Sequence, residues 1–228
     1  MQIRVYIDGC NLFYGRLKST SDKGINAKRR KLRWFNPDVL VKQFLPPNTE
    51  IEKIYFYIAD IKARYLGDKS PLRQQEYYKA LMTLSNIQIV KGRYAQHRTY
   101  MSKYPITLIA HSDGSKIETV QVLKTEEKRS DVNIASHIVR DACLDRFDMA
   151  ILVSNDSDLL EPMKIIQDLG KRFIILSPYS YHCQDFVSNF SSKDMRKIQE
   201  KHMIAAQFPD EIFDSANTLL AKRPAKWE

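Results

Sequence analysis

Short apolar runs rich in β-branched and aromatic residues recur along the chain, and helix-length segments separate most of them. The runs cover residues 3–7, 51–59, 87–94, 149–154 and 172–177. The clearest helical patterns cover residues 70–85, 130–145 and 156–170. Strands that alternate with helices pair in parallel, so the chain is predicted to form an α/β fold whose central, mostly parallel sheet is flanked by helices.

Two segments interrupt this alternation and are predicted to be insertions in one domain spanning residues 1–205. A basic segment within 19–50 is expected to form a loop over residues 19–34. The second insertion, within 95–122, has alternating residues around a "HSDGSK" turn, which indicates an antiparallel hairpin. Residues 206–228 are expected to form a C-terminal extension that holds a short helix at most.

The charge balance favours a polyanionic partner such as RNA. The chain has 36 Lys and Arg against 27 Asp and Glu, for a formal net charge of +9. Its three cysteines are widely spaced, which suits a reducing compartment and neither a disulfide framework nor a zinc-binding motif. Without a long apolar stretch or an export signal in the sequence, a cytoplasmic protein with no membrane partner is expected.

Acidic residues stand where the predicted strands end and the helices begin. Asp8 ends the first strand, Asp156 and Asp158 follow the strand "AILVSN", and Asp131 opens the helix "SDVNIASHIV" on its apolar face. In a parallel sheet these positions share the carboxyl edge, where ligands bind. Each acid alone could be a helix cap or a turn residue. The four together predict a site at that edge.

Clustered carboxylates repel one another unless a cation lies among them. Oxygen ligands favour Mg²⁺ or Mn²⁺ over zinc. Beside a basic surface, such a site suits phosphodiester hydrolysis, because the metal lowers the pKa of the attacking water and neutralises phosphate charge. A phosphatase of the haloacid-dehalogenase type is a weaker alternative, since Cys10 stands where its second aspartate is needed.

Four segments resemble the NYN domain, specifically its LabA-like branch, within the PIN-like nuclease superfamily. They are "YIDGCN", "TEEKRSDVNIASHIVRDA", "FDMAILVSNDSDL" and "RPAKW". The resemblance runs from Met1 to about Trp227 and implies a three-layer α/β domain that cleaves RNA with bound divalent metal, leaving a 5′-phosphate and a 3′-hydroxyl. It implies Asp8, Asp131, Asp156 and Asp158 as metal-binding and catalytic acids.

The resemblance also places a supporting residue and a departure from the family pattern. Asn11 matches the asparagine after the first acid and is expected to orient Asp8 or the attacking water. Where many relatives read "EKG" before the second acid, this chain has Arg129, which could add a phosphate contact or obstruct one.

Basic residues interleaved with tyrosines predict where RNA would bind, since cations hold the backbone and rings stack on unpaired bases. The predicted nucleic-acid-binding residues are Lys28, Arg29, Arg30, Lys31, Arg93, Tyr94, Arg98, Lys124, Lys128 and Arg129. Two alternatives do not involve RNA: residues 28–31 could belong to an ordinary solvent-exposed loop, and the hairpin tyrosines could pack against neighbours across the strands. We therefore predict a metal-dependent endoribonuclease acting on single-stranded or structured RNA. An RNA-binding module without turnover is the alternative, and a homodimer would suit a long substrate.

Overall fold

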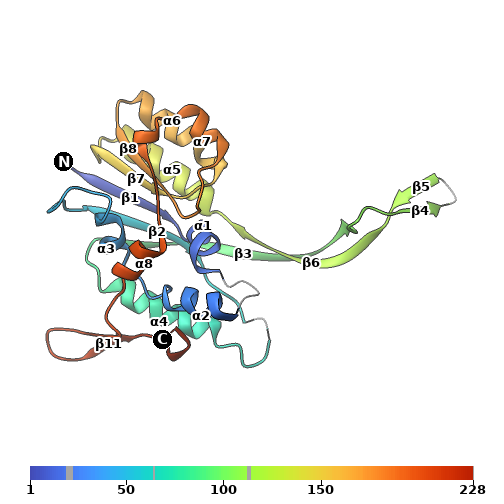
Figure 1. Cartoon of the computed structure of the whole chain (residues 1–228), viewed down its shortest axis with the longest axis horizontal. Coiled ribbons are helices and arrows are strands. Elements are labelled where there is room, and N and C mark those ends of the chain that lie inside the picture. The colour runs from blue at the N-terminus through green and yellow to red at the C-terminus, as the bar shows by residue number, and fades with distance from the viewer. Residues whose placement is uncertain (19–22, 64, 112–113, 228) are drawn as a thin grey trace.

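The five predicted strands form the parallel centre of one sheet in the computed structural model, which describes residues 1–18, 23–63, 65–111 and 114–227 (Figure 1). Within these residues the sheet has the strand order β6-β3-β2-β1-β7-β8-β9, and only the β3–β6 pair is antiparallel. Its strands are β1 (Ile3–Asp8), β2 (Lys53–Ala59), β3 (Ile87–Ser102), β6 (Thr119–Lys128), β7 (Met149–Val153), β8 (Arg172–Ser177) and β9 (Met195–Lys197). The predicted α/β fold is confirmed.

The chain builds the sheet outward in two directions from β1. It passes from β1 through β2 to β3 on one side, and from β7 through β8 to β9 on the other. The connection after β1 crosses one face of the sheet, and the connection after β7 crosses the other. A crevice therefore opens between the carboxyl ends of these two strands. The switch point of the sheet therefore lies where Asp8 and Asp156 follow their strands.

Helices cover both faces of the sheet, as the three-layer prediction requires (Figure 1). One face carries α5 (Ser130–Cys143), α6 (Leu160–Asp168) and α7 (Gln184–Asn189). The other carries α2 (Lys23–Lys31), α3 (Pro37–Lys42) and α4 (Ser70–Met82). Alternate residues of β1 serve the two cores, since Val5 and Ile7 pack on the α4 side and Tyr6 on the α5 side.

The loop predicted over residues 19–34 is wrong where the structure describes it. Residues 19–22 lie outside the described residues, but Lys23–Lys31 form helix α2. Lysine and arginine are good helix formers, so a dense basic charge did not imply a loop. The predicted insertion over residues 19–50 contributes to the core, because Trp34, Phe35 and Leu40 are fully or almost fully buried.

The predicted hairpin is confirmed as a long arm that projects from the body (Figure 1). We call residues 93–111 and 114–128 the arm. Strands β3 and β6 pair antiparallel from Arg93 opposite Lys128 to Ser102 opposite Thr119. Beyond them, β4 (Leu108–His111) pairs with β5 (Gly114–Ile117), and the predicted "HSDGSK" turn between them falls at residues 112–113, outside the described residues.

The C-terminal extension differs from the short helix expected of it. It contains an antiparallel pair, β10 (Glu211–Phe213) and β11 (Leu219–Lys222), and a final 3₁₀ turn, η4 (Ala225–Trp227). The indole of Trp227 is 7% exposed and lies 6.5 Å from the Trp34 ring, centroid to centroid. This contact holds the C-terminal tail against the body. Because it joins residues almost two hundred positions apart, no pattern of neighbouring residues in the sequence could have predicted it.

Five further short helical elements complete the described fold, and of these only η2 falls within a helix that the sequence predicted, over residues 156–170. The first turn after β1 is α1 (Gly9–Leu12), followed by a π-helical turn, η1 (Phe13–Leu17). A 3₁₀ turn, η2 (Ser157–Leu159), precedes α6, another, η3 (Ser192–Asp194), precedes β9, and α8 (Glu200–Ala205) follows it. Of these, α1 follows β1 and η2 follows β7 at the carboxyl edge, so these two position the candidate site.

Candidate carboxylate site

Three acids from separate segments meet at the switch point of the sheet. Asp8 ends β1, Asp131 lies in the first turn of α5, and Asp156 caps the turn after β7. One carboxylate oxygen from each lies within 4.8 Å of the others. The structure therefore brings together three of the four acids that the sequence singled out.

Asp8 is the buried member of the group, with 2% of its surface exposed. Its Oδ1 accepts a hydrogen bond from Asn11 N at 2.9 Å, and its Oδ2 accepts one from Ser154 Oγ at 3.0 Å. The pKa of Asp8 is raised to about 7, chiefly by burial and also by the nearby charges of Asp131 and Asp156, against the lowering effect of these two donors.

Glycine at position 9 lets the chain turn sharply after Asp8. A Cβ at Gly9 would lie 2.5 Å from the Tyr57 carbonyl oxygen of β2, closer than a carbon can approach. This close contact with β2 is the reason that a residue without a Cβ is needed directly after Asp8. It brings α1 down onto the strand ends, where the backbone N–H of Asn11 reaches Asp8.

Ser154 is a site residue that the sequence reasoning missed. Its hydroxyl is fully buried, donates to Asp8 and accepts from the backbone N–H of Asp156 at 3.2 Å. One side chain thus fixes two acids relative to each other. The sequence signal for this role was a serine directly before "NDSD". Without the fold, a polar residue at the end of an apolar strand indicates only where the strand ends.

Asn11 links the first and third motifs through its side chain. Its Oδ1 accepts from the backbone N–H of Asn155 at 2.9 Å, while Asn155 Oδ1 accepts from Cys183 N at 2.8 Å. The ends of β1, β7 and β8 are therefore joined in series. The orientation of Asp8 comes from the Asn11 backbone, and the Asn11 side chain fixes the neighbouring strand end.

Two further acids surround the group. Asp158 is exposed, and its backbone N–H donates to Asp156 Oδ1 at 3.0 Å. Glu127, at the end of β6, accepts from Ser130 Oγ at 2.8 Å. The pKa of Asp131 is raised to about 6, chiefly by burial and also by the charges of Asp156, Glu127 and Asp158. Asp158 lies outside the group that meets within 4.8 Å, and its catalytic role stays a prediction.

The donor set suits a hard divalent cation. Its ligand atoms are all carboxylate oxygens, the type that Mg²⁺ and Mn²⁺ prefer. The raised pKa values of Asp8 and Asp131 report repulsion and desolvation that a cation among them would relieve. The cluster could therefore hold a divalent metal.

Arg129 adopts a backbone conformation that favours glycine, with φ at +88°. This explains why a glycine suits the position before the second acid. Arg129→Gly is expected to raise the free energy of unfolding by about 0.5–1 kcal/mol, since the left-handed region costs a side-chain-bearing residue about 1–2 kcal/mol and glycine's freedom in the unfolded chain offsets part of the gain. Arg129→Ala keeps the strain and is the control. Urea unfolding that gives equal stability for the two variants would contradict this account.

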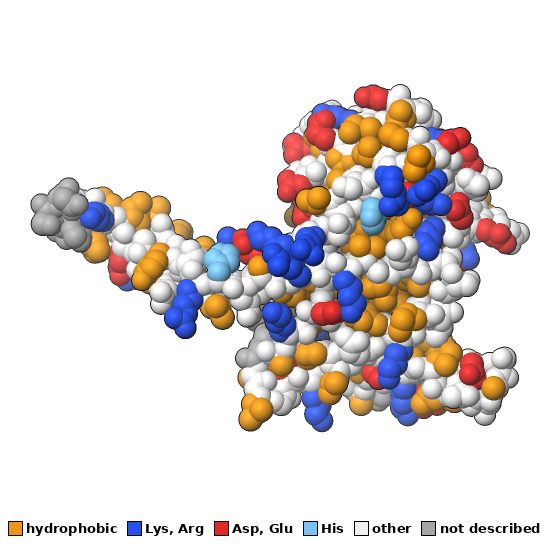
Figure 2. Space-filling view, turned by 180° about the vertical axis from the view of Figure 1, so that it is seen from behind, with side chains coloured by type: hydrophobic (Ala, Val, Ile, Leu, Met, Phe, Trp, Pro, Cys, Tyr) orange, Lys and Arg blue, Asp and Glu red, His pale blue; other side chains and the backbone are white. Residues whose placement is uncertain are grey.

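The predicted nucleic-acid-binding residues of the arm divide between its two faces. Directly opposed residues share a face, so Arg93, Lys124 and Lys128 lie on one side. Figure 2 shows Lys and Arg side chains gathered at the base of the arm. Glu126 lies among them and bonds Lys124 at 2.5 Å and Lys128 at 3.1 Å, so part of this charge is neutralised.

The opposite face of the arm carries Tyr94 and Arg98. Tyr94 is half-buried, with its hydroxyl 3.8 Å from Cys10 Sγ and its strand partner Glu127 beside the acids. Tyr100 and Tyr104 are 68% and 93% exposed, so the alternative in which the arm's tyrosines pack across strands does not hold for them. Of the predicted aromatic contacts, only Tyr94 lies near the carboxylates.

The basic residues of α2 lie on the α4 side of the sheet (Figure 1). Arg29 donates to the Lys18 carbonyl oxygen at 2.9 Å, so its guanidinium helps to hold α2 in place. Lys28 and Lys31 are exposed and Arg30 is half-buried. The structure thus gives Arg29 a structural contact, and RNA binding by this group stays a prediction.

The carboxylate cluster lies at the switch point of an open α/β sheet, which is where such sheets bind their ligands. The chain belongs to the NYN domain family, whose model matches residues 2–197. This match suggests a nuclease-like activity. None of the described helices has the length and apolarity needed to cross a membrane.

Two individual proteins are similar to this chain. The chain is 27% identical over 181 residues to 6-hydroxy-3-succinoylpyridine 3-monooxygenase HspA of Pseudomonas putida, an alignment that covers 73% of this chain and 56% of that protein. The chain therefore spans just over half the length of this curated relative, whose name describes that protein's own reaction. A crystal structure of a Vibrio parahaemolyticus protein of unknown function has a TM-score of 0.50 and 16% identity, covering 87% of this chain and 93% of that one, and supports the fold alone.

Proposed function

We propose that this protein is a metal-dependent ribonuclease that hydrolyses phosphodiester bonds, with single-stranded RNA as its main substrate. The observation that carries the proposal is the meeting of Asp8, Asp131 and Asp156 within 4.8 Å at the switch point of an NYN domain. Mg²⁺ or Mn²⁺ bound there would lower the pKa of the attacking water and neutralise charge on the phosphate.

The chain's own residues have distinct parts in this proposal. Asp8, Asp131 and Asp156 hold the ion, and Ser154 and the Asn11 backbone keep Asp8 oriented. Asp158 is proposed to position the attacking water from the rim of the site. Lys124, Lys128 and Arg93 contact phosphates beside it, because they lie at the base of the arm, where β6 leads into α5.

The test is incubation of the purified protein with single-stranded, hairpin and duplex RNA and DNA in Mn²⁺, Mg²⁺ or chelator. We expect cleavage of single-stranded RNA with either metal, none in chelator, and products with a 5′-phosphate and a 3′-hydroxyl. Asp156→Asn serves as the inactive control. Salt-sensitive RNA binding without cleavage in any metal would instead favour an RNA-binding module with the same site.

A further inference from the structure

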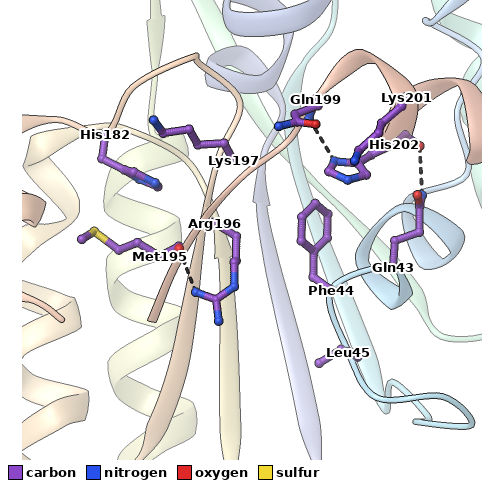
Figure 3. Close-up of a pocket in the computed structure, with 10 residues that line it drawn as sticks. All are labelled: Gln43, Phe44, Leu45, His182, Met195, Arg196, Lys197, Gln199, Lys201 and His202. Carbon is purple, nitrogen blue, oxygen red and sulfur yellow. Dashed lines mark hydrogen bonds between the residues drawn. The ribbon is translucent and has the colours of Figure 1, made fainter. Parts of the chain in front are cut away.

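We propose that single-stranded RNA leaves the carboxylate site over a tyrosine platform and enters a basic groove at the β8–β9 side of the sheet. The platform consists of Tyr14, Tyr179 and Tyr181. The groove is lined in part by His182, Lys197, Lys201 and His202 (Figure 3). This inference rests on the proposed function and names the path of its substrate; the sequence prediction had placed RNA binding on the arm and on residues 28–31 instead.

The platform lies at the same carboxyl edge of the sheet as the acids. Tyr179 and Tyr181 lie in the turn after β8, with ring centroids 5.4 Å apart, and Tyr181 is 57% exposed. Ser177 fixes the turn, because its Oγ donates to the Tyr181 carbonyl at 2.6 Å and accepts from Tyr179 N at 3.1 Å. Strand β8 pairs in parallel with β7, so the turn after β8 lies at the same carboxyl edge of the sheet as Asp156. Burial raises the pKa of Tyr179, and the charges of Tyr181, Asp8 and Asp156 raise it as well.

Tyr14 extends the platform from the other side. It lies in η1, where Gly15 approaches the Pro178 carbonyl so closely that a Cβ would lie 2.8 Å from it. Tyr14 is 51% exposed, and Lys18 Nζ lies 4.6 Å from its ring centroid. Exposed rings held by a rigid backbone, with a cation beside them, are the elements on which unpaired bases stack.

The groove begins where the platform ends. His182 follows Tyr181 directly, and Lys197 pairs in register with Ser177 on the neighbouring strand. In Figure 3, His182 and Lys197 lie on the β9 side and Lys201 and His202 on the α8 side. The ten residues that line the groove include two lysines and an arginine and no acid, so its charge suits an anion.

Arg16 offers a phosphate contact next to the platform residue Tyr14, in the same turn η1. It follows Gly15 in η1 and is half-buried, and its Nε has no hydrogen-bond partner among the described residues. Burial and the neighbouring Arg29 lower its pKa, and Glu200 is the acid that offsets this. A half-buried guanidinium with an unused donor gains a partner when a phosphate binds. Stacking rings followed by cations for the backbone describe single-stranded RNA better than an acidic peptide.

The test is binding of a fluorescein-labelled single-stranded RNA of mixed sequence, measured by fluorescence anisotropy in chelator so that cleavage cannot interfere. Tyr181→Ala is expected to weaken binding about 5- to 150-fold, the range for loss of one stacked base, while Tyr181→Phe keeps the ring and binds like the wild type. The double variant Lys197→Ala/Lys201→Ala should reduce the slope of log affinity against log salt by about 1.4.

The matched control removes the same charge elsewhere. Lys79→Ala/Lys164→Ala alters an exposed lysine of α4 and a half-buried lysine of α6, both far from the groove in sequence. This double variant should leave the salt slope close to that of the wild type, apart from the long-range effect of net charge that both double variants share. Wild-type affinity for Tyr181→Ala, or equal slopes for the two double variants, would overturn the path. The path would also be overturned if the wild type bound no RNA, or if the variants lost affinity for duplex RNA as much as for single-stranded RNA.

The failure of this path can be told from the failure of the proposed function. If the wild type cleaves RNA and the variants bind and cleave as it does, the ribonuclease stands and the path is wrong. If the wild type binds RNA but cleaves none in Mn²⁺ or Mg²⁺, while the platform and groove variants lose binding, the path stands and the ribonuclease is wrong.

Discussion

Replacing Asp8 with asparagine is expected to abolish metal-dependent RNA cleavage and, in chelator at pH 8, to raise the temperature of unfolding. Asp8 is 2% exposed and its pKa is raised to about 7, chiefly by burial, so its ionised form destabilises the folded protein. A shift from 3.8 to about 7 corresponds to a penalty of up to about 4 kcal/mol at pH 8. Asparagine removes that penalty together with a metal ligand.

The sign of the pH dependence follows from the raised pKa. The folded state holds the Asp8 proton more tightly than the unfolded state, so the favourable contribution is fully present below pH 3.8 and is lost as pH rises through about 7. The stabilisation by Asp8→Asn should therefore be larger at pH 8 than at pH 5. Mn²⁺ should raise the wild-type unfolding temperature more at pH 8 than at pH 5, because metal competes with protons for these acids.

Thermal unfolding at both pH values, with and without Mn²⁺, and a cleavage assay measure these effects. Asp158→Asn is the matched control, since it removes an exposed acid from the same edge and should leave metal-free stability at both pH values close to that of the wild type. An Asp8→Asn protein that cleaves RNA at the wild-type rate, or that unfolds at a lower temperature than the wild type in chelator at pH 8, would contradict the account of the site.

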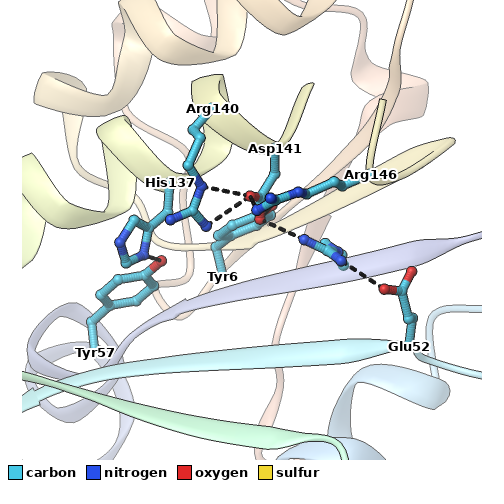
Figure 4. Close-up of polar contacts among 8 residues, drawn as sticks. Tyr6, Glu52, Tyr57, His137, Arg140, Asp141 and Arg146 are labelled. Atoms are coloured by element: carbon cyan, nitrogen blue, oxygen red, sulfur yellow. Dashed lines mark hydrogen bonds and ion pairs between the residues drawn. The ribbon is translucent and has the colours of Figure 1, made fainter. Parts of the chain in front are cut away.

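Asp141→Ala is expected to lower the free energy of unfolding by about 3–5 kcal/mol, because it removes the buried carboxylate that pairs with the largely buried Arg4 and accepts from the buried Tyr6 hydroxyl. The Asp141 side chain is fully buried near the C-terminal end of α5 (Figure 4). Its oxygens accept from Arg4 and Tyr6 at 3.0 Å each and from Arg140 at 2.7 and 2.9 Å, and Arg146 lies 3.3 Å away.

This cluster has the opposite pH dependence to Asp8. Burial raises the pKa of Asp141, but the hydrogen bonds from Arg140, Arg4 and Tyr6 together outweigh it and hold the pKa below its usual value. Its contribution to stability is therefore present above pH 3.8 and is lost as pH falls through the folded-state pKa. Loss of stability towards low pH should be less steep in Asp141→Ala than in the wild type.

Urea unfolding at pH 7 and at pH 3 checks this prediction. Asp145→Asn is the control, because it breaks an ion pair with Lys171 in which Asp145 is 88% exposed, and asparagine tolerates the positive φ of that position. The control should unfold with the wild type. Equal stability of Asp141→Ala and the wild type at pH 7 would show that the cluster is not structural.

The pattern of neighbouring residues was enough to predict the helices and strands with strong apolar periodicity, and the positions of the acids relative to them. The predicted strand over 172–177 coincides with β8, and the helix over 130–145 appears as α5, Ser130–Cys143. Elements held by distant partners were missed. The β10–β11 pair and the burial of Trp227 depend on contacts with α4 and with Trp34, which no window of neighbouring residues contains.

The candidate site, too, was predictable only where local sequence determines it. From its sequence alone, the chain could be assigned a parallel α/β sheet and four acids at the carboxyl edge, because strand ends and helix starts are set by local apolar periodicity and by topology. Only the tertiary structure brought three acids within 4.8 Å, left Asp158 exposed outside that group and joined Asp8 to Asp156 through Ser154. The physical reason is that distance, burial and pKa depend on which strand ends become neighbours in space, and chain order does not record this.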